Sequence, residues 1–249
     1  MNRLLFASAA ALAAMLAAPP LAAAPGDHAG VVADTTRSEA NRKLDESRNP
    51  AAVLDFAGYE KGEVVADFMA GGGYYTELIS RTVGPRGRVY ALEPSSFYDA
   101  KVWDALTAGN RNVSTLVAPV AAMQLAPKSV DSVFAHLVYH DLYWESEKYK
   151  YARVEPAAVA ANWYAALKPG GTLVIVDHVG PGGDTRALVE KLHRIDPATV
   201  KADMAAAGFE LVAESDVLQR SDDDHSTNVF DPKVRGKTDR FMMKFRRPS

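Results

Sequence analysis

The segment that most constrains the fold is residues 64–79, VVADFMAGGGYYTELI, where an apolar run ends at an acid and leads through glycines into a helical pattern. Residues 64–66 suit a buried strand, and Tyr75, Leu78 and Ile79 recur at the spacing of one helix face. Glycine permits positive φ and lets a ligand approach the backbone amides at the start of the following helix. The segment therefore predicts a strand, a tight turn and a helix, with a nucleotide or nucleoside site at the turn.

A second apolar run follows the turn at the distance expected of a nucleotide-binding fold. Residues 88–92 form this run, which ends in Glu93 about twenty residues beyond the glycines. In a doubly wound sheet, an acid at the end of the second strand accepts hydrogen bonds from ribose hydroxyls. This order of elements favours a cofactor site over a glycine turn that serves only as a tight connection.

These residues resemble the first motifs of the class I S-adenosylmethionine-dependent methyltransferases. That family has an acid followed by glycines at alternate positions, and its second strand also ends in an acid. Asp67, Gly71 and Gly73 match the first motif, and Glu93 matches the second. Met69 departs from the pattern, because it stands where the family usually has its first glycine, so the turn must accommodate a side chain there.

The resemblance covers roughly residues 51–245, and the chain is similar in particular to bacterial predicted methyltransferases, several with signal peptides. The family fold implied for this chain is α/β, a Rossmann-like doubly wound sheet of seven strands, mostly parallel, with an antiparallel C-terminal edge pair. Residues 209–217 and 240–245 fit that pair. The implied cofactor is S-adenosyl-L-methionine, and the implied cofactor-binding residues are Asp67, Ala70, Gly71, Gly72, Gly73 and Glu93.

Composition and charge limit the classes of partner. The chain has 249 residues, of which 48% are hydrophobic, enough for one α/β domain with a sizeable core. Its formal net charge is -3 without long runs of lysine or arginine, so no nucleic-acid-binding surface is predicted. We therefore expect a small-molecule substrate, and the oligomeric state stays open. The sequence contains no cysteine, which excludes disulfides, thiolate nucleophiles and thiolate metal sites.

The first residues have the plan of a secretory signal peptide. Arg3 supplies a basic start, residues 4–18 form a short apolar stretch, and small residues follow up to position 24. A membrane anchor needs a longer unbroken apolar run, so no integral membrane segment is expected once the signal peptide, residues 1–24, is removed. The protein is therefore expected to be exported to the periplasm.

The rest of the chain divides into a short leader and one domain. Residues 25–36 are polar and are predicted to be a flexible leader. Residues 37–249 are predicted to form the methyltransferase-like domain. Its N-terminal helical cap, with helical patterns at residues 37–47 and after Pro50, should cover one side of the cofactor cleft.

A dense polar and aromatic loop, residues 138–144, follows the predicted fourth strand. Open α/β sheets bind ligands beyond the carboxyl ends of their strands, where the strand order reverses, so Tyr139, His140 and Asp141 should face the cleft. Methyl transfer to a protic acceptor needs a base, and imidazole titrates near neutrality. His140 is therefore the candidate base, with Asp141 as its support and Tyr139 as a residue that orients a substrate hydroxyl.

Two alternatives remain open for this loop. The loop could simply pack against the helical cap. A divalent metal could instead bind at the same edge of the sheet, where imidazole and carboxylate side chains gather: His136, His140, Asp177, His178 and His193. Their spacing matches no known ligand motif, and hydrogen bonds explain these histidines more simply, so no metal site is predicted.

The predicted function is S-adenosylmethionine-dependent methyl transfer to an unidentified small-molecule acceptor. The alternative is an exported protein that binds a ligand or partner on a methyltransferase fold without catalysis. Three features favour this alternative: the export signal, Met69 in the glycine motif, and Pro119, which stands near the place where many family members carry an acid for adenine. Asp67, the glycines and Glu93 favour the enzyme, because a pure scaffold would not need them together.

Overall fold

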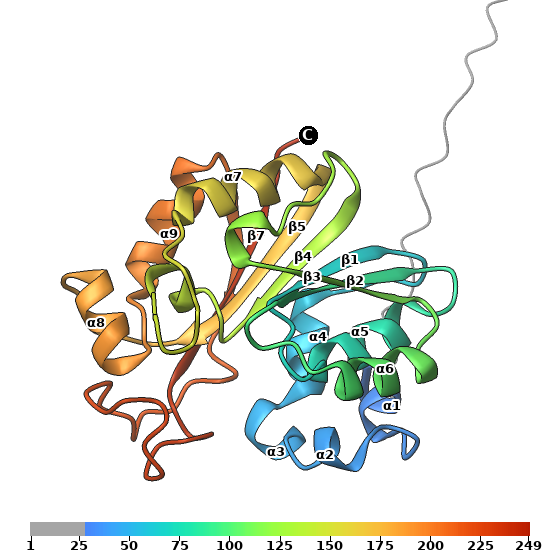
Figure 1. Cartoon of the computed structure of the whole chain (residues 1–249), viewed down its shortest axis with the longest axis horizontal. Helices are drawn as coiled ribbons and strands as arrows, with labels where there is room; N and C mark the ends of the chain where they lie inside the picture. Colours follow the sequence, from blue (N-terminus) through green and yellow to red (C-terminus); the bar gives the residue numbers. More distant parts are fainter. Residues whose placement is uncertain (1–27) are drawn as a thin grey trace, which may run out of the picture.

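The computed structural model describes residues 28–249, and its centre is one sheet of seven strands in the order β3, β2, β1, β4, β5, β7, β6 (Figure 1). Neighbouring strands are parallel except at β7, which is antiparallel to both β5 and β6. The strands are β1 (Val64–Phe68), β2 (Arg88–Pro94), β3 (Val113–Ala118), β4 (Val130–His136), β5 (Leu167–His178), β6 (Glu210–Ser215) and β7 (Arg240–Arg246).

This topology confirms the predicted Rossmann-like fold with an antiparallel pair at its C-terminal edge. The chain moves outward from β1 to β3 and then returns to β4, on the other side of β1. The strand order therefore reverses between β1 and β4, where Phe68 pairs with Ala135. The residues that follow these two strands meet at one edge of the sheet, which is where ligands bind in open α/β folds.

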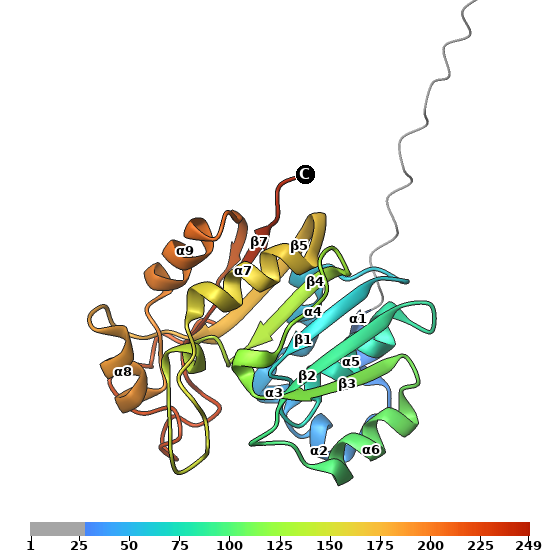
Figure 2. The same cartoon turned by 45° about the horizontal axis from the view of Figure 1, so that its top comes forward.

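Helices cover both faces of the sheet (Figure 2). Helices α4, α5 and α6 pack on one face, and α7 and α9 pack on the other. The helices are α1 (His28–Ala33), α2 (Glu39–Arg42), α3 (Asp45–Arg48), α4 (Pro50–Ala57), α5 (Tyr74–Val83), α6 (Ala100–Gly109), α7 (Pro156–Ala166), α8 (Thr185–Leu192) and α9 (Pro197–Ala206), with 3-10 helices η1 (Val120–Ala122) and η2 (His140–Tyr143).

Each core takes alternate residues of the central strands, because successive side chains in a strand point to opposite faces. Val65 and Phe134 belong to the core under α4 and α5, whereas Ala66 and Val133 belong to the core under α7 and α9. Both faces are covered, so the strands read as continuous apolar runs. That is why residues 64–66 are recognisable as a strand in the sequence.

The N-terminal part departs from the predicted order of elements. The sequence predicts a flexible leader at residues 25–36, but the described part contains α1, which packs against α4 and α5. His28 of α1 is 4% exposed, and its Nδ1 lies 2.6 Å from Asp55 Oδ1. The helical pattern at residues 37–47 forms two single turns, α2 and α3, with Ser38 as the N-cap of α2.

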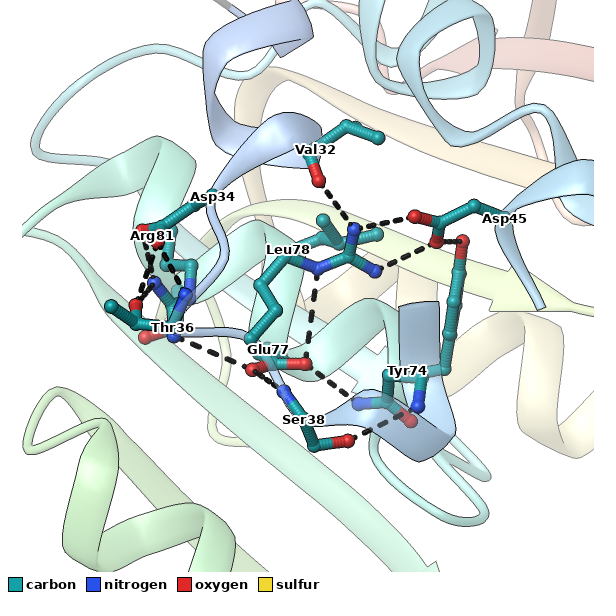
Figure 3. A network of polar contacts seen from close by, with 12 residues as sticks. Val32, Asp34, Thr36, Ser38, Asp45, Tyr74, Glu77, Leu78 and Arg81 are labelled. Atoms are coloured by element: carbon teal, nitrogen blue, oxygen red, sulfur yellow. Dashed lines mark hydrogen bonds and ion pairs between the residues drawn. The ribbon is translucent and has the colours of Figure 1, made fainter. Parts of the chain in front are cut away.

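A network of ion pairs and hydrogen bonds fastens α2 and α3 to α5 (Figure 3). Arg37 is 2% exposed, and its guanidinium donates two hydrogen bonds of 2.8 Å to the Asp45 carboxylate. Tyr74 donates to the same carboxylate at 2.7 Å, and Glu77 accepts a hydrogen bond from Asn41 at 2.7 Å. Because α5 begins directly after the glycine turn, this network holds α3 beside that turn.

The expected signal peptide, residues 1–24, lies outside the described residues, as does the start of the predicted leader at residues 25–27. Within residues 28–249, no helix combines the length and the apolar character that crossing a membrane requires.

Candidate active site

The turn between β1 and α5 uses left-handed backbone at three positions. Met69, Gly71 and Gly73 have φ values of 51°, 59° and 73°. A Cβ on Gly73 would lie 2.2 Å from Leu106 Cδ1 of α6, so this glycine is required for packing. A Cβ on Gly71 would meet nothing within 4 Å. Gly71 therefore faces open space, as the hypothesis of a ligand beside the turn requires.

Met69 takes a left-handed conformation that glycine adopts without strain. Left-handed backbone costs a residue with a side chain roughly 1–2 kcal/mol. The Met69 side chain is 7% exposed, belongs to the core under α7, and accepts a hydrogen bond from the Tyr151 hydroxyl at 3.6 Å. Burial of a methionine contributes roughly 1.5–3 kcal/mol, which offsets the backbone cost. The turn thus accommodates a side chain by burying it.

Two buried carboxyl groups flank the turn. Asp67 is 3% exposed and accepts a 2.6 Å hydrogen bond from Thr76 Oγ1, yet burial raises its pKa to about 7. Glu93 is 1% exposed and accepts a 2.7 Å hydrogen bond from the Gly71 amide, and burial raises its pKa to about 8. The acid that the sequence assigns to ribose therefore also holds the glycine turn, through one of its two oxygens.

A cavity of about 280 Å³, which we call the turn cavity, lies over this turn at the edge where β1 and β4 end. Its lining combines an acid, Asp67, with a cation, Arg48 of α3. The Arg48 guanidinium lies 4.3 Å from the centroid of the Tyr74 ring and forms no ion pair with any residue of the described chain. The turn cavity therefore offers one guanidinium and one carboxyl group to a ligand.

A second group of charged residues surrounds His140, the first residue of η2. His140 is 3% exposed, and its backbone amide and its ring Nδ1 each lie 2.8 Å from an oxygen of the Asp177 carboxylate. Asp177, near the end of β5, is completely buried. On the other side of the ring, Asp141 Oδ1 lies 3.4 Å from His140 Nε2. The imidazole is therefore held between two carboxyl groups.

These two carboxyl groups decide the charge of the imidazole. Burial lowers the pKa of His140, but the charges of Asp177 and Asp141 outweigh burial and raise that pKa to about 9. Burial raises the pKa of Asp141 to about 6 against the opposing charge of His140. At pH 7, His140 thus already carries a proton and Asp141 is ionised. This corrects the expectation that His140 is the base, because the group free to accept a proton is Asp141.

Tyr139 does not face the cleft, and the expectation that it orients a substrate is wrong. The side chain is completely buried in the core under α7, with its ring centroid 6.1 Å from that of Trp163. Its hydroxyl donates a 2.8 Å hydrogen bond to Asp203 of α9. Tyr139 and His140 are neighbours at the start of η2, but their side chains face different sides: His140 lies at the cleft, whereas Tyr139 enters the core under α7.

A cavity of about 500 Å³, which we call the histidine cavity, adjoins the turn cavity. Leu44, Arg48 and Leu137 line both. His140 and Asp141 line the histidine cavity but not the turn cavity. The long connection between β6 and β7 forms much of the remaining wall of the histidine cavity. The site thus consists of two adjoining cavities, one over the glycine turn and one over the imidazole and its free carboxylate.

A comparison with protein families matches a methyltransferase domain to residues 66–175, which include the glycine turn, Glu93 and η2. The chain has the Rossmann-like fold of the methyltransferases, and residues 66–175 are similar to their domain. Two solved structures share this fold. An S-adenosylmethionine-dependent methyltransferase from Aquifex aeolicus has a TM-score of 0.57 and 19% identity, over 88% of this chain and 98% of that chain. Another from Mesorhizobium loti has a TM-score of 0.58 and 16% identity, over 82% of this chain and 100% of that chain.

This fold also serves another reaction. The cyclase SpnF superposes on it with a TM-score of 0.57 at 16% identity, over 87% of this chain and 85% of that chain. Likeness at such low identity concerns the fold alone. The reaction has to be argued from the side chains of the two cavities.

The histidines of the metal alternative make separate contacts at this edge of the sheet. In residues 28–249, no three or more histidine, cysteine, aspartate or glutamate side chains are grouped so that they could hold a metal ion. His178 Nδ1 lies 2.7 Å from Thr238 Oγ1, and the ring centroids of His140 and His193 are 5.7 Å apart. His136 packs against an aromatic ring of α5. Hydrogen bonds hold His140 and His178, whereas His136 and His193 make ring contacts, and His136 Nε2 and His193 Nδ1 have no hydrogen-bond partner among residues 28–249.

Two residues of the candidate site were not given their places by the sequence. The sequence suggested Asp177 only as a possible metal ligand. An acid at the end of the fifth strand is nevertheless a signal of the same kind as Glu93 at the end of the second. Arg48 had no signal at all, because its place at the border of both cavities results from the way the N-terminal cap folds over the glycine turn.

Proposed function

We propose that this domain transfers a methyl group from S-adenosyl-L-methionine to a small-molecule acceptor. The observation that carries the proposal is the junction of the two cavities at Arg48 and Leu137, one cavity over the glycine turn and the other over His140 and Asp141. Methyl transfer from a sulfonium is an in-line displacement, so the protein has chiefly to hold donor and acceptor in adjoining sites. The family match over residues 66–175 supports the same conclusion.

The turn cavity fits the charges of this donor. S-adenosyl-L-methionine supplies an activated methyl group, and its methionine part bears both an ammonium and a carboxylate. We assign the ammonium to Asp67 and the carboxylate to Arg48, which line this cavity with opposite charges. The open space beside Gly71 leaves room against the backbone. We assign the ribose hydroxyls to the oxygen of Glu93 that the Gly71 amide does not use.

For an acceptor that loses a proton, we assign the proton to the Asp141 carboxylate. His140 lies 3.4 Å from this carboxylate and holds it in place. Asp177 holds His140 in turn, through the backbone amide and the ring. A carboxyl with a pKa of about 6 is ionised at pH 7 and remains basic enough to act as a general base.

The donor site can be tested at Gly71. Asparagine tolerates a φ of 59° and would place its side chain in the open space beside the turn. We expect Gly71→Asn to weaken the binding of S-adenosylhomocysteine, measured by calorimetry, by about tenfold or more, because the side chain occupies room that the ligand needs.

Gly62→Asn is the matched control. Gly62 is exposed, has a φ of 97°, and precedes β1 at the opposite edge of the sheet, so asparagine there also strains a backbone with positive φ, at least as strongly as at Gly71, while the cavity is untouched. Its affinity for S-adenosylhomocysteine should equal that of the wild type. A wild-type protein that shows neither heat nor thermal shift with this ligand or the donor at millimolar concentration would refute the proposed function.

The non-catalytic alternative is less well supported. Burial raises the pKa of Asp67, of Asp141 and of Glu93, so each carboxyl is kept in a place that disfavours its charged form. Asp67 and Asp141 also line the two cavities, and perturbed carboxyls in cavities are typical of functional sites. A protein that only binds the donor would need Asp67, but it would not need an ionised Asp141 beside a protonated His140.

We also propose that the protein is exported, on the sequence of residues 1–24 alone. Fractionation of cells that express the full-length chain should place it in the periplasm, with a mass that lacks about the first 24 residues. A variant without residues 2–24 should stay in the cytoplasm. Full-length protein with an intact N-terminus in the cytoplasmic fraction would contradict export.

A further inference from the structure

We propose that the acceptor is an organic anion whose carboxylate or phosphate group binds Arg235 and Arg240 in the histidine cavity. The inference rests on the proposed function, because it names the class of molecule that the second cavity takes. Methyl transfer by itself requires neither of these arginines, so their presence calls for a role in binding.

Arg240 is a buried cation without a carboxylate partner. It is 5% exposed at the start of β7, and it donates from Nη1 to the Ser47 carbonyl at 2.8 Å and from Nε to Thr238 Oγ1 at 3.4 Å. Among the residues that the structure describes, none accepts from its Nη2 and no acid forms an ion pair with it. Buried arginines are normally paired. Burial lowers the pKa of Arg240 to about 10, so it stays charged at pH 7.

The charges around Arg240 leave the cavity positive. Arg235, on the connection between β6 and β7, is exposed, lines the same cavity, and its side chain forms no hydrogen bond or ion pair in the described part of the chain. Arg48 lies at the border with the turn cavity. Of the described residues that line the histidine cavity, Asp141 is the one acid, and the His140 imidazolium lies beside it.

The remaining wall is apolar and suits a small organic body. Leu44 and Leu137 line it from the side of the turn cavity, and Val229 and Phe230 line it from the connection between β6 and β7. Its volume of about 500 Å³ is in the range of small-molecule sites. A guanidinium matches the geometry of a carboxylate or phosphate with paired hydrogen bonds. A compact apolar molecule with one oxyanion therefore fits this cavity.

The carboxylate of the methyl donor is a competing occupant for the arginines. Arg48 lines both cavities and is the arginine within reach of a donor in the turn cavity. Arg235 and Arg240 line the histidine cavity and not the turn cavity. The two sources of the anion are therefore separable, because saturation with S-adenosylhomocysteine fills the donor's place and leaves the histidine cavity free.

The test is calorimetry at constant ionic strength on the protein saturated with S-adenosylhomocysteine. The probes are benzoate, phenyl phosphate and benzamide, which share an aromatic body and differ in the polar group. We expect at least one of the two anions to bind about tenfold or more tightly than neutral benzamide, because charge-assisted hydrogen bonds to guanidinium are the strong ones. The tighter anion identifies the oxyanion that the acceptor carries.

Two charge-reversal variants separate this site from a general effect of charge. Arg235→Glu should weaken binding of the tighter anion by about tenfold or more, because repulsion replaces attraction. Arg86→Glu is the matched control: Arg86 is also exposed and lies between α5 and β2 at the opposite edge of the sheet, where salt screens its charge from the cavity. Neither side chain forms a hydrogen bond or ion pair in residues 28–249, so both variants should fold and should bind S-adenosylhomocysteine like the wild type.

The outcomes distinguish this inference from the proposed function. Anions that bind no more tightly than benzamide, or equal anion binding by the two variants, would overturn the inference and leave the donor site intact. Anion binding that S-adenosylhomocysteine abolishes would assign the site to the donor's own carboxylate and would overturn it as well. Anion binding by a wild-type protein that binds no donor would instead refute the proposed function.

Discussion

Replacement of Asp141 by asparagine should lower turnover by about 10²-fold or more, the usual effect of losing a general base. Asparagine has the shape of the carboxylate but cannot take the proton from the acceptor. The Asp141 side chain is 20% exposed, and among the described residues His140 is its one polar contact, so the fold should tolerate the change. Asp104→Asn on the exposed side of α6 is the control, and its turnover should equal that of the wild type.

The pH dependence of kcat/KM provides a second measure of the same role. Asp141 has to be ionised, so the rate should rise as the pH increases through about 6. His140 has to keep its proton beside the carboxylate, so the rate should fall above about 9. In Asp141→Asn the rise near pH 6 should disappear, and an unchanged profile would remove Asp141 from the mechanism.

The charge state of His140 can be measured before any acceptor is identified. Titration of its ring by NMR should give a pKa of about 9 in the wild type. The value should fall in Asp141→Asn, because one of the two carboxylates that raise it is lost. A wild-type pKa at or below the ordinary value of about 6.5 would return His140 to the role of base that the sequence suggested.

Replacement of Asp67 by asparagine should weaken donor binding and stabilise the protein at the same time. The donor's ammonium would lose a charge-assisted hydrogen bond, which corresponds to a roughly tenfold to hundredfold loss of affinity for S-adenosylhomocysteine. Asparagine keeps the shape and can still accept the hydrogen bond from Thr76 Oγ1. Calorimetry at pH 8 compares the affinity of the variant for S-adenosylhomocysteine with that of the wild type, and Asp104→Asn is again the control.

The stability effect has a sign and a pH range that follow from the pKa of Asp67. Burial raises this pKa from 3.8 to about 7, so the folded state binds the proton more tightly than the unfolded state does. The carboxylate therefore destabilises the fold increasingly as the pH rises from about 4 to about 7, and fully above that range. The gain in melting temperature in Asp67→Asn should be largest at pH 8 and should vanish near pH 4. An equal gain in melting temperature at pH 4 and at pH 8 would contradict the raised pKa of Asp67.

The fold could be predicted from the sequence because its determinants are local. Strands covered on both faces are continuous apolar runs, and glycines mark the ends of helices and the turn before Tyr74. Asp67, Gly71 and Glu93 were recognisable for the same reason, since their spacing along two neighbouring strands is a property of the chain alone. The helix at His28–Ala33 was missed, because it depends on packing against α4 and α5 and not on a strong pattern of its own.

The chemistry of the site was less accessible. His140 and Asp141 were found, but the loop pattern could not show that Tyr139 turns into the opposite core or that Asp177 lies against the ring of His140. That contact joins residues from β5 and η2, and it is what changes the pKa of the imidazole. The identity of the base therefore depends on the end of β5 lying beside η2.

The sequence by itself determined the strands, the helices and the glycine turn, because apolar periodicity and glycine spacing act over a few residues. The doubly wound order of the strands was implied by the resemblance to the class I methyltransferases. The tertiary structure alone decided the charge of the two cavities. Arg48 comes from the N-terminal cap and Arg240 from the last strand, so these cations meet His140 only after the chain has folded. Burial and charge proximity then shift the pKa values on which the chemistry depends, and neither quantity exists in the unfolded chain.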